Sequence, residues 1–528
     1  MATIYTGLEA SWKLPGVYIN VDLGRATPSA GAVTRKVLII GNALDSGAAV
    51  NAPFFPDGVE SSVGDNSLVR VPDIRKAEAY FGRGSELYGM AKAAFEANSF
   101  VELWAFVQPE LTSTPVESAT VRFLPVSGAT YSSVNQNLVR IETLGKELTM
   151  RILSSDDLAD HDAAVSFYRR LSQAFNMTLG ELPYRCAVDD TAGTEGIVFI
   201  AKHPGDDWGG AQVLVDISTA PHLQLSAVNP ILIGALPGVE TDHQLDDVEN
   251  GALNPSSSPL FAERFHYVAT PYNSQNDVVD LKDFIDGQAD AKIGYRQQGI
   301  FAVQALGASV ETILGVCEHP RMQCVLAPGD WRSTGNYTPG QLAAAVAATR
   351  CKKESADPAA NLCLQAVAGV PITIDEMLMT RTEMNDATDI GITVLSPFQG
   401  RMVIQRSVTT AANSTTTPVL DTGKVTVSDF VADDIQTKMA TVYKGFKLSP
   451  DTDLPLPSRV ATPSSIRQAL IGWLRIHEAK GLVVQVTQNS EGIQVELDEE
   501  VAGRVNFSIP EEVIDIFAVG AGNVIQIG

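Results

Sequence analysis

The chain has 528 residues, of which 45% are apolar and 19% charged, enough for about three or four folded domains. Its 38 Lys and Arg residues against 62 Asp and Glu residues give a net charge of −24, which disfavours nucleic acid and anionic membranes as partners. The sequence opens without the pattern of a signal peptide, and no apolar run approaches the ~18 residues of a membrane span. The five scattered cysteines are typical of reduced thiols in a cytosol.

The first long elements predict a strand, a helix and a second strand. A compact apolar strand at 36–41 is followed by a loop-like stretch at 43–70. Asp73 is a candidate cap for a helix over 74–98, which the glycines of Gly82-Arg83-Gly84 would break or bend. A strand at 100–107 completes the unit. This order is typical of a parallel sheet with a right-handed crossover.

Residues 116–218 read as an inserted outer domain that is rich in β structure. We expect short strands at 121–125, 139–143, 148–153, 197–202 and 213–217, with one helix at about 156–175. The α/β pattern resumes at about Ala220, with strands at 230–233, 266–271, 299–305 and 323–327 and helices at 277–291, 308–318 and 339–352. The sequence therefore predicts a doubly wound α/β middle domain, 31–115 and 219–384, which is split by the insertion.

A last α+β domain is expected over 385–509. It would begin with a hairpin of strands at 391–395 and 401–407 and continue with a helix at about 428–443. Thr462 and Pro463 start a clear helix over 464–480, whose apolar stripe consists of Ile466, Leu470, Trp473, Leu474 and His477. Arg467, Arg475 and Lys480 against Glu478 leave this helix with two net positive charges. It either meets an acidic partner or, more commonly for such a helix, is a solvated face.

Both ends of the chain carry a short strand on a loose tether. Near the start, Val17, Tyr18, Ile19 and Val21 form a strand before the flexible stretch 24–31. Near the end, Gly520 and Gly522 give Val519-Gly520-Ala521-Gly522 the freedom of a hinge, and Val524, Ile525 and Ile527 form a last apolar run. Such a strand either completes its own sheet, the commoner case, or adds to a neighbour's sheet edge.

No pattern rises to a catalytic, cofactor-binding or metal site. The triplets Asp45-Ser46-Gly47 and Asp421-Thr422-Gly423 could supply the paired carboxylates of an aspartic protease, but their contexts differ and both are typical of turns. Cys317, His319 and Cys324 lack a second ligand pair at zinc-site spacing and are expected to be packing residues. Neither a phosphate-binding loop nor a Gly-x-Ser-x-Gly elbow occurs. We expect no enzyme and no cofactor.

Nearly the whole chain resembles the tail sheath proteins of contractile bacteriophage tails, closest to those of Mu-like phages. The stretches that carry the resemblance are Pro15-Gly16-Val17-Tyr18-Ile19, Arg35-Lys36-Val37-Leu38-Ile39-Ile40-Gly41, Phe81-Gly82-Arg83-Gly84-Ser85-Glu86-Leu87, Ala93-Ala94-Phe95-Glu96-Ala97-Asn98-Ser99-Phe100-Val101-Glu102-Leu103-Trp104, Tyr267-Val268-Ala269-Thr270-Pro271-Tyr272, Arg406-Ser407-Val408-Thr409-Thr410 and Thr462-Pro463 with its helix. The family's middle domain is subtilisin-like in shape only, and this chain has no Ser-His-Asp motifs of a subtilase.

The resemblance implies a subunit that forms hexameric rings stacked helically around a tail tube. It implies that an N-terminal arm, 1–30, and a C-terminal arm, 510–528, add strands to neighbouring subunits, through about 17–21 and 519–527. Acceptor strands would lie within 483–507. The helix over 464–480 would face the tube, so that Arg467, Arg475 and Lys480 are candidate tube contacts.

The implied function is structural. The sheath would contract to drive the tube through the host envelope during genome delivery, with the tube protein, the baseplate and tail terminator proteins and further copies of itself as partners. It would contact neither nucleic acid nor membrane directly, and it would reside in the virion tail after assembly in the bacterial host cytoplasm. The alternatives are the sheath of a contractile bacteriocin or secretion apparatus, an aspartic protease or an α/β hydrolase, which are more remote, and a monomeric binding protein, which would form no polymer.

Overall fold

The structure is a computed structural model that describes residues 35–44, 63–109, 116–203, 210–234, 245, 253, 258–304, 306–335, 337–373, 378–412, 414, 419–452 and 457–518. The predicted arm strands at 17–21 and 519–527, and Asp45, lie outside these residues. Within the described residues, no helix has the length and apolar character that crossing a membrane requires.

A nine-stranded sheet forms the centre of the molecule, in the order β15-β17-β16-β14-β13-β12-β1-β3-β2. Six neighbouring strands are parallel: β16 (Ile392–Phe398), β14 (Met322–Leu326), β13 (Gln298–Val303), β12 (Tyr267–Ala269), β1 (Lys36–Gly41) and β3 (Glu102–Val107). Antiparallel strands close both edges: β2 (Leu68–Val71) on one side, β17 (Arg401–Ile404) and β15 (Gln365–Ala366) on the other.

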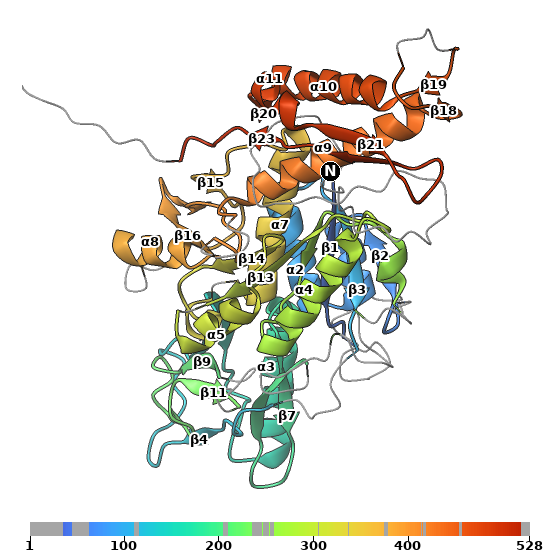
Figure 1. Ribbon diagram of the computed structural model, residues 1–528. Coiled ribbons are helices and arrows are strands. Elements are labelled where there is room, and N and C mark those ends of the chain that lie inside the picture. The colour runs from blue at the N-terminus through green and yellow to red at the C-terminus, as the bar shows by residue number, and fades with distance from the viewer. Residues whose placement is uncertain are drawn as a thin grey trace, which may run out of the picture.

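Helices cover both faces of this sheet (Figure 1). One face packs against α1 (Ile74–Phe81), α2 (Glu86–Ala97) and α7 (Pro339–Ala356), and the other against α4 (Gln275–Ala289), α5 (Ala308–Val316) and α8 (Arg381–Asp389). Along β1, Val37 and Ile39 enter the first core, whereas Leu38 and Ile40 enter the second. A strand that is apolar on both faces is what a parallel sheet between two helical layers requires. The expected α/β class is confirmed.

The predicted break in the first helix is also present. Asp73 caps α1 by accepting from the N–H of Lys76 at 3.0 Å, and Ser85 caps α2 by accepting from the N–H of Tyr88 at 3.1 Å. Between them Gly84 has a φ of +78°, and a Cβ there would lie 2.3 Å from the carbonyl oxygen of Leu182. Only glycine accommodates both the backbone angle and this close approach.

Residues 116–234 form a separate unit with its own core, which includes Phe123, Phe167, Phe175 and Phe199. Its helix is α3 (His161–Thr178), and α6 (Trp331–Thr334) contributes Trp331 to the same core. Its sheets are β11 (Ile231–Ile233), β9 (Ala211–Asp216), β5 (Leu138–Thr143) and β6 (Lys146–Arg151) in that order, β4 (Phe123–Pro125) with β10 (Leu223–Leu225), and β7 (Tyr184–Asp189) with β8 (Gly196–Ala201). The five expected strands are present, while β7 and β10 were not predicted.

The sheet pairings correct three sequence predictions. The strand expected in the α/β sheet at 230–233 is β11, which pairs with β9, and β10 pairs with β4, so the limit at 219 is too early. The hairpin expected to open the last domain at 385 is β16 with β17, and β16 pairs with β14 in the large sheet. Strand β2 occupies the end of the stretch expected to be loop-like. Short strands do not reveal their partners in sequence, because pairing is a tertiary choice.

The segment from α9 to β23 forms a C-terminal layer at one end of the molecule. It lies opposite the 116–234 unit, with the large sheet between them (Figure 1). Its helices are α9 (Thr422–Val442), α10 (Pro463–Ala479) and α11 (Val486–Asn489). Its strands form three pairs: β18 (Lys447–Leu448) with β19 (Val460–Ala461), β20 (Val483–Val484) with β23 (Glu512–Val513), and β21 (Gln494–Leu497) with β22 (Val505–Ser508).

Candidate functional site

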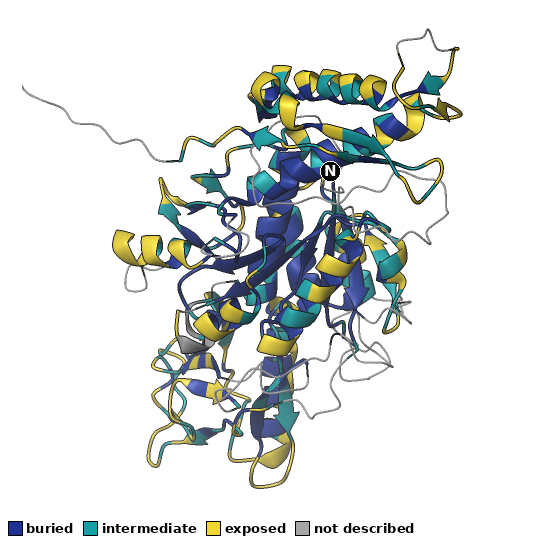
Figure 2. Cartoon of the chain, viewed as in Figure 1, coloured by how far each residue is buried: buried dark blue, intermediate teal, exposed yellow. Residues whose placement is uncertain are grey.

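Helix α10 lies on the outer side of the C-terminal layer and exposes one face along its length (Figure 2). Thr462 caps it in a reciprocal arrangement with Ser465, and Pro463 occupies its first turn, as expected. The predicted stripe faces inward: four of its members are buried and Trp473 is half-buried. The buried members are Ile466, Leu470, Leu474 and His477. The opposite face of α10 therefore takes no part in the core and is exposed.

The three candidate tube contacts differ in their exposure to solvent. Arg475 and Lys480 are exposed, and Ile476 beside them is 47% exposed. Arg467 is half-buried, and it donates from Nε to the carbonyl oxygen of Ile493 at 2.9 Å and from Nη2 to that of Ser490 at 2.6 Å. Arg467 thus holds the segment before β21 against α10.

A buried histidine joins α10 to α9. The Nε2 atom of His477 lies 2.8 Å from Oδ2 of Asp434, and Lys438 also pairs with this carboxylate. Burial alone would raise the pKa of Asp434, but the bonds to His477 and Lys438 outweigh it and hold the pKa below its ordinary value. The ring of Phe430 meets the His477 ring edge-on at 5.9 Å.

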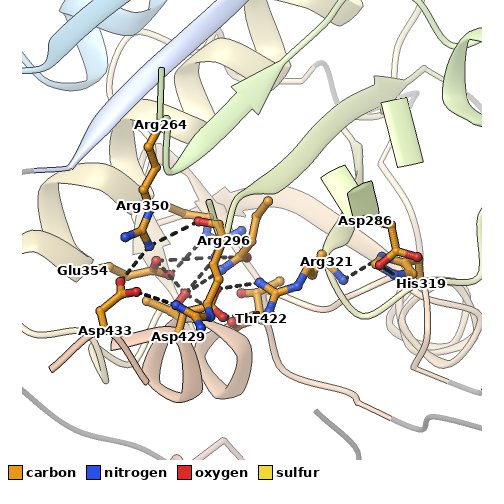
Figure 3. Close-up of polar contacts among 12 residues, drawn as sticks. Arg264, Asp286, Arg296, His319, Arg321, Arg350, Glu354, Thr422, Asp429 and Asp433 are labelled. Carbon is orange, nitrogen blue, oxygen red and sulfur yellow. Dashed lines mark hydrogen bonds and ion pairs between the residues drawn. The ribbon is translucent and has the colours of Figure 1, made fainter. Parts of the chain in front are cut away.

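Charged pairs join α9 to the central sheet (Figure 3). Arg321 donates to both carboxylate oxygens of Asp429, at 2.6 and 2.7 Å, and both side chains are buried. Asp433, one turn further along α9, accepts from Arg296 at 2.7 Å and from Arg264 at 2.6 Å. A bidentate, buried pair is among the stronger polar contacts available to a protein. Ion pairs are therefore among the contacts that hold α9 against the central sheet.

Behind these pairs lies a fully buried polar cluster. Arg350 donates to Glu354 at 3.1 Å, to Gln323 at 2.8 Å and to Gln298 at 2.7 Å. Glu354 also accepts from the hydroxyls of Thr426 on α9, at 3.0 Å, and Tyr267. Burial raises the pKa of Tyr267 well above its ordinary value. Sequence reasoning missed this cluster; its signal is Arg350 and Glu354, four apart in an alanine-rich helix, with a glutamine in each of two apolar strands.

The region predicted to accept the arms contains β20, β21 and β22. Among the described residues, β20 pairs with β23 alone, through Val483 with Val513 and Val484 with Glu512. Directly after β23, Ile514 is 42% and Phe517 80% exposed. The segment is held there by polar contacts, such as Asn361 Nδ2 donating to the Phe517 carbonyl oxygen at 2.9 Å. A two-stranded ladder of this size has little stability of its own.

Among the described residues, those weighed for catalysis or metal binding have structural roles. Asp421 pairs with Arg406 through two bonds of 2.8 and 3.0 Å and precedes α9, so it is a packed turn residue. Cys317 and Cys324 are buried in the core on one face of the large sheet. His319 pairs with Asp286 at 3.2 Å. In the described part of the chain, no three His, Cys, Asp or Glu side chains are grouped as metal ligands.

Comparison with known proteins found no matching family model. It found one curated relative, the Mu-like prophage FluMu tail sheath protein of Haemophilus influenzae, 27% identical over 122 residues. The chain resembles a Mu-like tail sheath protein. The aligned stretch spans 23% of this chain and 22% of the length of that relative.

Solved structures were also compared with the chain. The sheath tail protein from Desulfitobacterium hafniense is 10% identical, with a TM-score of 0.43, over 94% of this chain and 100% of that one. The helical sheath of the anti-feeding prophage in its contracted state is 8% identical, with a TM-score of 0.43, over 98% of this chain and 99% of that one.

Proposed function

We propose that this protein is the sheath subunit of a contractile tail. The observation that carries the proposal is the sequence similarity to a Mu-like tail sheath protein. In this role the chain polymerises as stacked hexameric rings around a tail tube and contracts to drive the tube through the host envelope. The interfaces of such a helical polymer are heterologous and do not close. Tube, baseplate and tail terminator proteins would be its partners, and the virion tail its location.

The arms would link the subunits. Residues 17–21 and 519–527 would add to strand edges of neighbouring copies, and β20 with β23 is the candidate acceptor. The support is the small size of this pair and the exposure of Ile514 and Phe517 next to it. Each added backbone hydrogen bond contributes roughly 1 kcal/mol, so a few bonds together with apolar burial make a durable link. Gly520 and Gly522 would let subunits rotate without losing the strand.

The C-terminal layer, the large sheet and the 116–234 unit would each have a different place in the sheath. The C-terminal layer would face the tube through α10, with Arg475 and Lys480 as contacts, whereas Arg467 already bonds within its own chain. The large sheet would form the middle of the sheath wall and the 116–234 unit its outer surface. This assignment is supported by the position of the C-terminal layer and the 116–234 unit at opposite ends of the molecule (Figure 1).

Truncation of the C-terminal arm tests the proposal. We expect the full chain to form rings or striated tubes by negative-stain electron microscopy, and a chain ending at Val513 to form none. The matched control replaces residues 514–528 with an unrelated glycine-serine segment of equal length, which should also fail. Polymers from the truncated chain would refute linkage by the arm, and the absence of polymer from the full chain supplied with tube and baseplate would refute the sheath itself.

A sheath of a contractile bacteriocin or secretion apparatus would use the same subunit geometry. The genes next to this one would distinguish the cases, since a phage tail is accompanied by capsid and packaging genes. The protease alternative is disfavoured by the role of Asp421, whose carboxylate is bound to Arg406.

A further inference from the structure

A cavity of about 300 Å³ lies where α9 meets the N-terminal ends of three neighbouring parallel strands. Arg35 directly precedes β1, His266 directly precedes β12, and Arg296 lies two residues before β13. These three side chains line the cavity together with Arg264, Asp429 and Asp433. Arg35 is 6% and Arg296 2% exposed, so the basic groups are built into the wall rather than displayed on the surface.

The carboxylates of the wall are already neutralised. Asp429 accepts hydrogen bonds from both terminal nitrogens of Arg321. Asp433 is shared between Arg264 and Arg296 (Figure 3). Asp434, the third carboxylate, pairs with Lys438 and His477. The wall therefore has no carboxylate left to neutralise a further cation.

Several donors of the wall remain unused. Arg35 donates from Nε to the carbonyl oxygen of Glu354 at 3.1 Å, and its two terminal nitrogens have no hydrogen-bond partner among the described residues. The buried Nε of Arg264 likewise lacks a partner in the described part of the chain. His266 accepts the N–H of Lys36 on Nδ1 at 3.1 Å, which leaves the proton on Nε2. Of these donors the Nε of Arg264 is fully buried, and because a buried donor without an acceptor is costly, an acceptor from outside the wall would be favoured there.

The charges around the cavity do not balance. Three arginines, Arg35, Arg264 and Arg296, and three carboxylates, Asp429, Asp433 and Asp434, line the cavity. Arg321 and Lys438, which lie outside the lining, also pair with Asp429 and Asp434, so two positive charges are in excess, or one when the carboxyl of Glu511 near Asp429 is ionised. We propose that this cavity is a binding site for a tetrahedral oxyanion such as sulfate or phosphate, which Arg35, Arg264 and His266 hold between the sheet and α9. A dianion supplies the missing charge and the acceptor oxygens, and Arg is the side chain best suited to bind it.

The state of His266 agrees with a positive site. Burial and the neighbouring Arg264, Arg35 and Lys36 lower the pKa of His266 to about 2. The imidazole is therefore neutral at any ordinary pH and acts as a fixed N–H donor. Sulfate does not titrate in this range either, but burial raises the pKa of Glu511, which interacts electrostatically with Asp429 of the wall, to about 7. Sulfate binding should therefore weaken as the pH rises through about 7.

Thermal unfolding of the full chain in sulfate and in chloride, at equal ionic strength, tests the site. We expect sulfate at about ten times its dissociation constant to raise the melting temperature by roughly 1 °C more than chloride does. Arg35→Gln and Arg264→Gln should abolish this difference. Arg169→Gln, which removes an exposed arginine on α3, should keep it. The last variant corrects for the general stabilising effect of sulfate on folded proteins.

Equilibrium dialysis with radiolabelled sulfate gives a direct measurement. The unmodified protein should retain about one sulfate per chain, and Arg264→Gln should reduce the affinity at least tenfold. Arg264→Gln is the safer of the two variants, since Asp433 keeps its bond to Arg296. The proposal is overturned if the unmodified protein retains no sulfate. It is also overturned if sulfate raises the melting temperatures of Arg35→Gln and Arg264→Gln as much as that of the control, Arg169→Gln.

Discussion

Buried ion pairs determine how firmly α9 is attached to the central sheet. The pair of Arg321 and Asp429 is 5% and 8% exposed at its side chains, so each charge depends on the other for compensation. Removing one partner leaves the second buried without a counter-charge. By contrast, the exposed pair of Arg169 and Asp190, at 62% and 67%, is screened by solvent and contributes little.

This difference gives a first prediction. Arg321→Ala should lower the free energy of unfolding by about 3–5 kcal/mol, whereas Arg169→Ala should change it by less than about 1 kcal/mol. Chemical denaturation followed by circular dichroism measures both. Equal effects of the two variants would show that the buried pair does not stabilise the joint.

Glu181 connects the 116–234 unit to α2, and its contribution depends on pH. Its carboxylate accepts from Lys92 at 2.6 Å and from Lys146 at 3.0 Å. Burial would raise the pKa of Glu181, but these two bonds outweigh it and lower the pKa to about 2. A pKa that is depressed on folding stabilises the protein above the unfolded value of about 4.3, and this stabilisation is lost as the pH falls toward 2.

We therefore predict that Glu181→Gln lowers the melting temperature at pH 7 and that the deficit shrinks between about pH 4.3 and pH 2. Differential scanning calorimetry of both proteins across this range is the measurement. Glu499→Gln, at an exposed position, serves as the control. A deficit that stays constant down to pH 2 would contradict the assigned role of the carboxylate.

At the scale of elements, glycines have opposite meanings in two helical segments. Gly84 separates α1 from α2 with a φ of +78° and almost no room for a Cβ. Gly472 lies inside α10, is exposed, and has no heavy atom within 4 Å of its would-be Cβ. The first position requires glycine, and the second only loses helix propensity by having it.

Replacement by alanine should therefore have opposite effects at the two positions. Gly472→Ala should stabilise the protein by about 0.5–1 kcal/mol, and Gly84→Ala should destabilise it by at least about 1 kcal/mol. Urea denaturation of the two variants measures the difference. Destabilisation by Gly472→Ala would mean that α10 is packed more tightly than its exposed face indicates.

At the scale of the whole molecule, the proposed sheath depends on an acidic protein presenting a basic helix. The chain carries a net charge of −24, while the exposed side of α10 carries Arg475 and Lys480. Charge complementarity to a tube would fix the register of the sheath and speed its assembly more than it would add stability.

Reversing both charges tests this arrangement. Arg475→Glu with Lys480→Glu should reduce the assembly of sheath around purified tubes at least tenfold, seen by electron microscopy and sedimentation. The melting temperature should change by no more than about 1–2 °C, because surface substitutions have small effects on stability. Arg151→Glu with Arg169→Glu, on the 116–234 unit, is the matched control. Normal assembly by the α10 variant would remove this helix from the proposed tube contact.

Much of the local structure follows from the sequence. Apolar runs bounded by glycine and proline predicted β1, β3, β13 and β14, and the Thr462-Pro463 signal with its apolar stripe predicted α10 together with its buried face. These features depend on neighbours in the chain, through periodicity and capping, so a pattern in the sequence is sufficient.

The tertiary structure alone decided which sheet each short strand joins and where the basic side chains point. β11 and β16 carry no mark of their partners, because an apolar strand pairs equally well with any complementary edge. Arg467 turns inward to two carbonyl groups, and Arg35, Arg264 and Arg296 converge on one cavity from three strand ends. The positions of these arginine side chains depend on hydrogen-bond partners that are distant in the sequence and become neighbours only when the chain folds.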